Sequence, residues 1–363
     1  MEFALTEEQR LLQESVGRWV EGAVPRERLQ ALGDAAERAD PSLLHGLGDL
    51  GAFGVLVPEE HGGAGLGLLE AMLVQEALGR GAVPAPFTAT AVLAPLALAD
   101  APSALAETWL PRIAAGEARI AGGLSELAGV RPGTGLVLDH DTVSGTTRFV
   151  LDATEGTEAF VLAVGGTDLV WVDADALASP PVPLATIDRT RAVVELNLER
   201  TACTPLAEKG TAAPRLEQLL AAGRVLLAAD AFGAATTMLE RAVAYSLERR
   251  QFDRVIGSFQ SVKHLCAEMA AELEPCRSLL WYAAHVGDAD PEEFALMACH
   301  AKAHVGEVTQ FVARTATEVH GGIGFTHELG LHWFFKRIGL DRELLGNPDR
   351  ARQDAARLQG WAA

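Results

Sequence analysis

The hydrophobic pattern of the segment 214–247 predicts one long helix. Apolar residues recur at the three- and four-residue spacing of a helix face, and Pro214 suits the first turn of a helix. At 1.5 Å per residue such a helix is roughly 50 Å long, longer than most helices of globular domains. The positions that define it are Leu216, Leu219, Leu220, Leu226, Leu227, Ala231, Ala234, Ala235, Leu239, Val243 and Leu247. Small residues crowd its middle, so we expect other helices to pack closely against it.

Helical spacing also covers both ends of the chain. Thr6 precedes an acidic first turn and predicts a helix N-cap near the start. A loop at 250–260 separates the long helix from the next one. Further helices are expected at 41–50, 68–79, 261–287, 291–319 and 329–338. The pattern predicts a helical domain at 1–117 and a four-helix bundle at 208–363.

The segment 118–207 has a different pattern. Short alternating or β-branched runs follow one another there, with turn residues between them. Such runs occur at 136–138, 141–144, 148–151, 159–164, 168–172 and 192–196. This segment therefore predicts a small β-domain, a barrel or a sandwich, in the centre of a mostly α chain.

Composition excludes several classes of partner. The formal charge is −19, from 30 basic and 49 acidic residues, which argues against nucleic acid and against docking on anionic membranes. The four cysteines lie far apart and have no metal-ligand spacing, so no metal site is expected. The first residues have neither the basic flank nor the apolar run of a signal peptide. A cytoplasmic protein is the simplest interpretation.

Two motifs in the C-terminal region carry a resemblance to a known family. The first reads Arg-Arg-Gln-Phe at 249–252, followed by Ile-Gly-Ser-Phe-Gln at 256–260. The second reads His-Gly-Gly-Ile-Gly-Phe-Thr at 320–326. In this order, about 70 residues apart, they resemble the C-terminal domain of acyl-CoA dehydrogenases. The segment 47–67 is similar to the first helical domain of the same family, whose members desaturate acyl-CoA thioesters with a flavin, FAD.

The resemblance implies a set of flavin-binding residues. By motif position, Arg249, Gln251 and Phe252 match residues that contact the phosphates and adenine end of FAD across a dimer interface. The match also extends to Gln260, near the same cofactor, and to Gly321 and Gly322, in a turn that approaches a neighbouring subunit's flavin. An arginine suits a pyrophosphate because its fork donates two hydrogen bonds at once. Taken without the motif, Arg249 would be a solvated helix end.

Several positions depart from the family pattern. Asp253 stands where the family usually has glycine, and Glu318 where it usually has a glutamine that reaches the cofactor. Both add negative charge near the expected diphosphate. In the β-domain, the family's Thr-Glu-Pro turn beside the flavin ring is reduced to Ser125 and Glu126, without the proline. Ser125 is therefore either a flavin contact or part of an ordinary turn.

The catalytic base is missing from both positions where the family places it. One position precedes an arginine of the long helix, and here the residue before Arg224 is Gly223. The other is a Glu-Gly pair after the His-Gly-Gly turn, and here it reads Leu345-Gly346. Glu343 lies two residues away and is the one candidate base, with a surface glutamate as the alternative.

A scaffold without a base resembles one chain of the bacterial heteromeric members of the family. The leading hypothesis is such a subunit, paired in a heterotetramer with a related chain that carries the glutamate, and acting on a bulky acyl-CoA. A second hypothesis is a homomeric dehydrogenase that uses Glu343. A third is a non-enzymatic scaffold that keeps the fold and binds no flavin.

Overall fold

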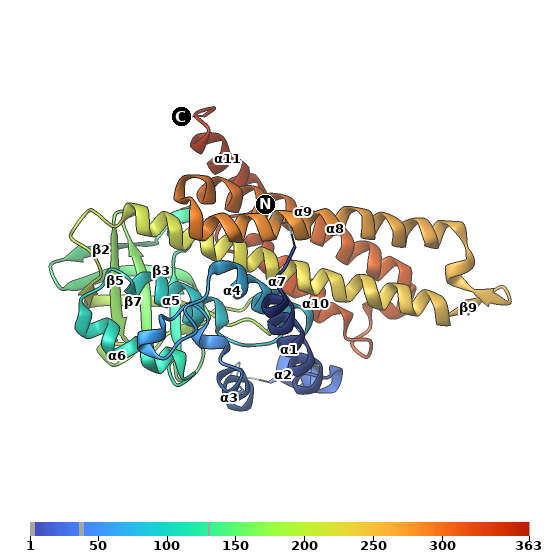
Figure 1. The fold of residues 1–363 in the computed structure, drawn as a ribbon, viewed down its shortest axis with the longest axis horizontal. Coiled ribbons are helices and arrows are strands. Elements are labelled where there is room, and N and C mark those ends of the chain that lie inside the picture. Colours follow the sequence, from blue (N-terminus) through green and yellow to red (C-terminus); the bar gives the residue numbers. More distant parts are fainter. Residues whose placement is uncertain (1–3, 36–39, 130, 363) are drawn as a thin grey trace.

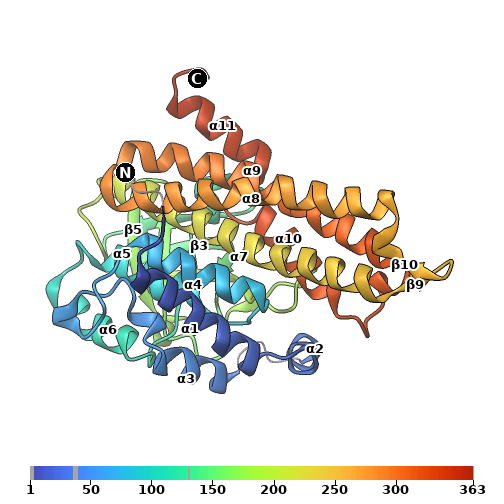
Figure 2. The same cartoon turned by 45° about the vertical axis from the view of Figure 1, so that its right-hand side comes forward.

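The computed structural model describes residues 4–35, 40–129 and 131–362. Long helices run from a β-domain at one end of the molecule to a small hairpin at the other, and shorter N-terminal helices pack along one side (Figure 1). The predicted architecture, mostly α with a central β-domain and a C-terminal bundle, is confirmed. The view in Figure 2 shows that the last helix projects away from the rest of the molecule.

The N-terminal region is helical, and Thr6 begins it as predicted. The Thr6 hydroxyl accepts a hydrogen bond from the Gln9 backbone N–H at 3.2 Å, and the Gln9 side chain accepts from the Thr6 backbone at 2.9 Å. The helices are α1 (Glu7–Ala23), α2 (Arg26–Asp34), α3 (Pro41–Asp49), α4 (Leu68–Arg80), a π-helical segment (Thr88–Leu93) that continues into α5 (Ala94–Leu98), and α6 (Ser103–Ala114). Helix α4 is almost entirely buried because α1 covers one side and the C-terminal bundle another.

The β-domain is one eight-stranded sheet. Its strands are β1 (Ile120–Gly123), β2 (Gly135–Asp139), β3 (Thr142–Leu151), β4 (Ala159–Val164), β5 (Asp168–Asp173), β6 (Val182–Pro183), β7 (Val193–Ala202) and β8 (Thr204–Pro205). They pair in the order β6-β7-β3-β1-β4-β5-β8, with β2 beside β3. Because successive strand residues point to opposite faces, β4 supplies Phe160, Leu162 and Val164 to the core of the β-domain. Its alternate residues pack against the helices.

The C-terminal bundle is built around α7. Its elements are α7 (Ala213–Glu248), the hairpin strands β9 (Arg250–Gln251) and β10 (Arg254–Val255), α8 (Gln260–Ala289), α9 (Pro291–His320), α10 (Leu331–Glu343) and α11 (Pro348–Leu358). Helix α7 packs against α4, α8, α9 and α10. This explains why its own apolar and small residues are distributed over all of its faces. By length and composition alone α7 would also be able to cross a membrane, but 94% of its most apolar window is buried inside the protein.

Two buried arginines join the three regions. Arg191, from the segment before β7, forms ion pairs with Asp152 at 3.3 Å, Asp230 at 2.8 Å and Asp341 at 3.1 Å. Arg337 of α10 lies 3.3 Å from Asp188 and 3.6 Å from Asp230. The N-terminal region completes the cluster, since the carbonyl of Val83 accepts a hydrogen bond from Arg337 at 2.8 Å and the Gln75 amide donates to Asp230 at 2.8 Å. All six charged side chains are at most 3% exposed.

The buried charges do not ionise equally. Burial opposes ionisation of Asp230, but Arg337 and Arg191 outweigh it and lower the pKa of Asp230 to about 2. Burial raises the pKa of Asp341 well above its ordinary value against the attraction of Arg191, and the charge of Asp230 adds to the rise. Of these two carboxyls, Asp341 therefore takes up a proton more readily than Asp230 as the pH falls.

We expect Asp230→Asn to lower the free energy of unfolding by about 3–5 kcal/mol, because it leaves the buried cations Arg191 and Arg337 short of a counter-charge. A matched surface change, Arg352→Gln, removes an ion pair to Glu307 whose side chains are about half exposed. It should cost less than about 1 kcal/mol. Urea unfolding of both variants checks this, and equal small losses would contradict the importance of the buried cluster.

Candidate functional site

The two positions to which the resemblance assigns a catalytic base come together in space. Gly223 lies on α7 and Leu345 follows α10, and a Cβ atom at position 223 would lie 2.5 Å from the Leu345 Cδ1 atom. Leu345 is 2% exposed, and Leu93 packs on the same spot, 3.9 Å from that Cβ position. These two positions are 122 residues apart in the sequence, but in the fold they occupy one place, which leucine methyl groups fill.

Arg224 fixes the backbone around Leu345. Its Nε donates to the Leu345 carbonyl at 2.9 Å, and its Nη2 contacts the Asp354 carboxylate at 2.6 Å. Leu345 has a φ of 54°, in the left-handed region that costs an L-residue roughly 1–2 kcal/mol. The buried guanidinium holds Leu345 in this conformation, and Gly346 follows with a φ of 97°.

Glu343, the candidate base of the sequence analysis, lies elsewhere. It is the last residue of α10, its side chain is 53% exposed, and it pairs with the neighbouring Arg342. Its carboxylate therefore belongs to the surface of the bundle, as the alternative interpretation had it.

Lys302 of α9 is buried in the part of the bundle that also holds Asp341, Arg224 and Glu343. Its Nζ donates to the Asp341 carbonyl, and the Arg224 and Glu343 charges both act on it. Burial lowers the pKa of Lys302 to about 7, although the negative charge of Asp341 opposes the shift. This ammonium group therefore titrates near neutral pH inside the bundle.

The predicted residues of the first flavin motif lie at the far end of the bundle, away from the β-domain (Figure 1). Arg249, Gln251 and Phe252 form a tight hairpin, and its two central residues, Phe252 and Asp253, have φ values of 51° and 61°. Asp tolerates this conformation better than most residues, which explains how it replaces the family's glycine. Phenylalanine does not, yet Phe252 is held there with 85% of its surface exposed. Its ring lies edge-on to the Phe259 ring, with 6.1 Å between the ring centres, and most of its surface is open to solvent.

The predicted glycine turn lies at the same end. The His320 ring stacks on Tyr245 of α7 with 4.8 Å between the ring centres, so the ends of α7 and α9 are joined. Gly321 ends α9 with a φ of 66°, and a Cβ at Gly321 or Gly322 would meet no described atom within 4 Å. The turn is thus open to solvent. Next to it Phe325 is 80% exposed.

Gln260 and Ser125 are the remaining predicted residues, and they lie far apart, one beside the hairpin and the other in the β-domain. Gln260 is exposed at the start of α8, beside the hairpin. Ser125 is buried in the β-domain, where its hydroxyl donates to the Phe149 carbonyl at 3.0 Å. Glu126 accepts hydrogen bonds from the Thr147 hydroxyl at 2.8 Å and from a backbone N–H. The chain therefore brings six of the seven predicted residues to one end and leaves Ser125 in an internally bonded turn.

In the described part of the chain, no group of three or more His, Cys, Asp or Glu side chains is placed to hold a metal ion.

Family models match most of the chain. Residues 6–117 match the N-terminal domain and residues 213–359 the C-terminal domain of acyl-CoA dehydrogenases. The acyl-CoA dehydrogenase IpdE2 of Mycolicibacterium smegmatis is 30% identical over 98% of this chain and 99% of its own length. IpdE2 of Mycobacterium tuberculosis is 33% identical over 82% of this chain and 80% of its own length. The chain belongs to the acyl-CoA dehydrogenase family.

Solved structures agree. A variant of the Tcur3481-Tcur3483 steroid ACAD has a TM-score of 0.87 at 30% identity, with 98% of each chain covered. The ChsE4-ChsE5 complex from Mycobacterium tuberculosis has a TM-score of 0.88 at 26% identity, with each chain fully covered. Members of the family are FAD-dependent oxidoreductases, and FAD is the cofactor of this fold.

The exposed end of the bundle fits one half of FAD. Arg249 offers a two-pronged donor for a diphosphate, and the glycine turn leaves backbone open to a close approach. Phe252 offers an aromatic face for an adenine ring. The roles of the individual residues remain predictions.

We expect Phe252→Gly to separate folding from cofactor binding. Glycine takes a positive φ without steric cost, so the unfolding free energy should change by less than about 1 kcal/mol, while FAD affinity falls at least about tenfold. Urea unfolding and visible flavin absorbance per chain measure the two effects. Trp361→Gly, at an aromatic residue 78% exposed outside the motifs, is the control and should leave FAD content unchanged.

Lys302→Met should remove a pH dependence of stability. The folded pKa of about 7 lies below the roughly 10.4 of an exposed lysine, so between these values the unfolded chain binds the extra proton and this residue's contribution to stability rises with pH. The unfolding free energy of wild type relative to the variant should therefore rise above pH 7, by up to about 1.4 kcal/mol per unit. A difference between wild type and variant that stays constant from pH 6 to about 9 would contradict this.

Proposed function

We propose that this chain is the subunit without a catalytic base in a hetero-oligomeric, FAD-dependent acyl-CoA dehydrogenase. The substrate would be an acyl-CoA thioester with a bulky acyl group, and the missing carboxylate would come from a related partner chain. The packing of Leu345 on Gly223 carries this proposal, because it fills with methyl groups the one place at which a member of this family needs a carboxylate.

The chemistry explains why that place matters. The α-proton of a thioester is weakly acidic, so its removal needs a positioned base together with donors at the thioester oxygen. When bound, FAD supplies the acceptor for the hydride that leaves the β-carbon. At 53% exposure and paired with Arg342, Glu343 does not meet the first requirement.

The other end of the bundle supports a role in the partner's site. Arg249, Phe252 and the turn at Gly321 and Gly322 are exposed, and a Cβ at either glycine would meet no described atom within 4 Å. Arg249 would hold a diphosphate, Phe252 would pack on the adenine, and the glycine turn would admit the cofactor. These residues bind and orient FAD but take no part in proton removal.

The relatives support the same assignment. ChsE4-ChsE5 is a complex of two named chains. The Tcur3481-Tcur3483 protein also carries two names, and it is a steroid ACAD. Similarity over the full length of both makes a two-chain assembly and a bulky acyl group the proposals that agree best with the geometry of this chain.

Co-expression with a related, Glu-bearing chain tests the proposal. We expect a stable complex that contains FAD and oxidises acyl-CoA, whereas this chain alone should show no turnover. In the complex, changing the partner's glutamate to glutamine should lower turnover by about 10²–10⁴, and Glu343→Gln in this chain should leave it unchanged.

Two outcomes would sink the proposal. One is a self-assembled homomer of this chain that is active. The other is a large loss of turnover on Glu343→Gln, which would identify Glu343 as the base of an ordinary homomeric dehydrogenase.

A further inference from the structure

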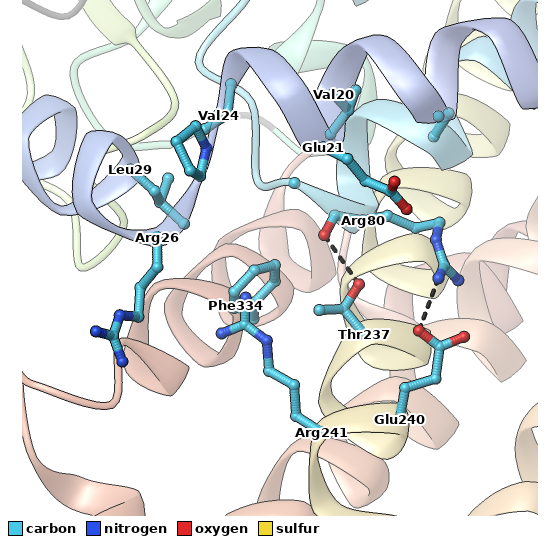
Figure 3. A pocket seen from close by; sticks show the side chains of 14 residues that line it. Val20, Glu21, Val24, Arg26, Leu29, Arg80, Thr237, Glu240, Arg241 and Phe334 are labelled. Atoms are coloured by element: carbon cyan, nitrogen blue, oxygen red, sulfur yellow. Dashed lines mark hydrogen bonds and ion pairs between the residues drawn. The ribbon is translucent and has the colours of Figure 1, made fainter. Parts of the chain in front are cut away.

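A pocket of about 310 Å³ lies between the N-terminal helices and the bundle. Helices α1, α2 and α4 line one side of it, and α7 and α10 line the other (Figure 3). None of its lining residues belongs to the flavin motifs or to the Gly223–Leu345 contact. The pocket is therefore separate from the site described above.

Three arginines reach this pocket, and their partners differ. Arg80 pairs with Glu240, another lining residue, at 2.7 Å. Arg26 contacts Glu27, which lies outside the pocket, at 3.2 Å. Arg241 has no hydrogen bond or ion pair to any residue that the structure describes. The N–H donors of its guanidinium therefore have no acceptor in the described part of the chain.

The surroundings of Arg241 favour the binding of an anion. Its guanidinium lies over the Phe334 ring, 4.6 Å from the ring centre, so one face is covered while the N–H groups along the edge stay available (Figure 3). Burial lowers the pKa of Arg241, and the positive charge of Arg26 lowers it further. A partly buried cation without an acceptor, next to a second cation, is an unfavourable arrangement that a bound anion relieves.

The remaining lining decides what kind of anion fits. An apolar wall lies beside Arg26 and Arg241 and consists of Val20, Val24, Leu29 and Phe334. The carboxylates of Glu21 and Glu240 also line the pocket and disfavour a doubly charged group. The volume lies at the lower end of the range for small-molecule sites, roughly 300–1,000 Å³.

We propose that this pocket binds a small organic monoanion, a carboxylate with a short apolar tail. The carboxylate lies between Arg26 and Arg241, and the tail packs on Val24, Leu29 and Phe334. Such a ligand joins α2 to α7 and α10, three elements that meet at this pocket. It therefore stabilises the contact between the N-terminal helices and the bundle in proportion to its occupancy.

Hexanoate is the test ligand and hexanamide its neutral match. Calorimetry and thermal unfolding are measured on the full chain, as part of its complex where one forms. Hexanoate should bind saturably and raise Tm, and hexanamide should do neither. Arg241→Gln and Arg26→Gln should each weaken hexanoate binding at least about tenfold, the loss of a charge-assisted hydrogen bond. Arg18→Gln, at an exposed arginine of α1 that pairs with Glu14, should leave affinity unchanged.

Every other result counts against the proposal. Hexanoate that binds with equal affinity to wild type and to both arginine variants occupies another site, such as an acyl site. Inorganic phosphate that binds more tightly than hexanoate overturns the assignment of a monocarboxylate. Should Arg241→Gln fail to fold, Arg26→Gln decides alone, because Arg26 is half exposed. These readouts need neither FAD nor turnover, so they are separate from the test of the proposed function.

Discussion

The ion cluster around Arg191 and Arg337 is the constraint on which the rest of the structure depends. Its members come from the N-terminal helices, the β-domain and the bundle, and each lies almost fully out of water. A charge buried in this way is tolerable only while its partners stay in place, so no region can move away from the other two without leaving an unpaired ion behind. The relative positions of Gly223, Leu345 and the β-domain are fixed as a consequence.

Within this rigid frame, the two ends of the bundle have opposite character. Near the β-domain, side chains of the same protein fill the space: Leu345 covers Gly223, and the Ser125 hydroxyl is used by Phe149. At the other end, aromatic and basic side chains face solvent, and one of them is held in a strained turn. A chain that is closed where chemistry would occur and open where a neighbour would dock is suited to assist a reaction on another subunit.

The sequence predicted what local spacing controls. Helix α7 lies within one residue of the predicted limits because its apolar repeat is uninterrupted, and the β-branched runs became strands. Contacts between residues far apart in the sequence could not be predicted from local spacing. No local pattern distinguishes a carboxylate that will be buried beside an arginine from one on the surface, and this holds for Asp152, Asp188, Asp230 and Asp341. The pocket at Arg241 combines five separate segments and leaves no pattern in any one of them.

Helix α7 carries Gly223, one of the two positions where the resemblance places a carboxylate, and it ends directly before Arg249, which opens the predicted flavin motif. Gly223 and Arg249 are 26 residues apart, which along α7 amounts to roughly 39 Å. Substitutions at one end therefore leave the geometry of the other end intact. After a gene duplication, selection can relax at the first while it continues at the second, and a complete enzyme can become a dedicated companion through very few changes. The architecture makes such a division of labour accessible in small steps.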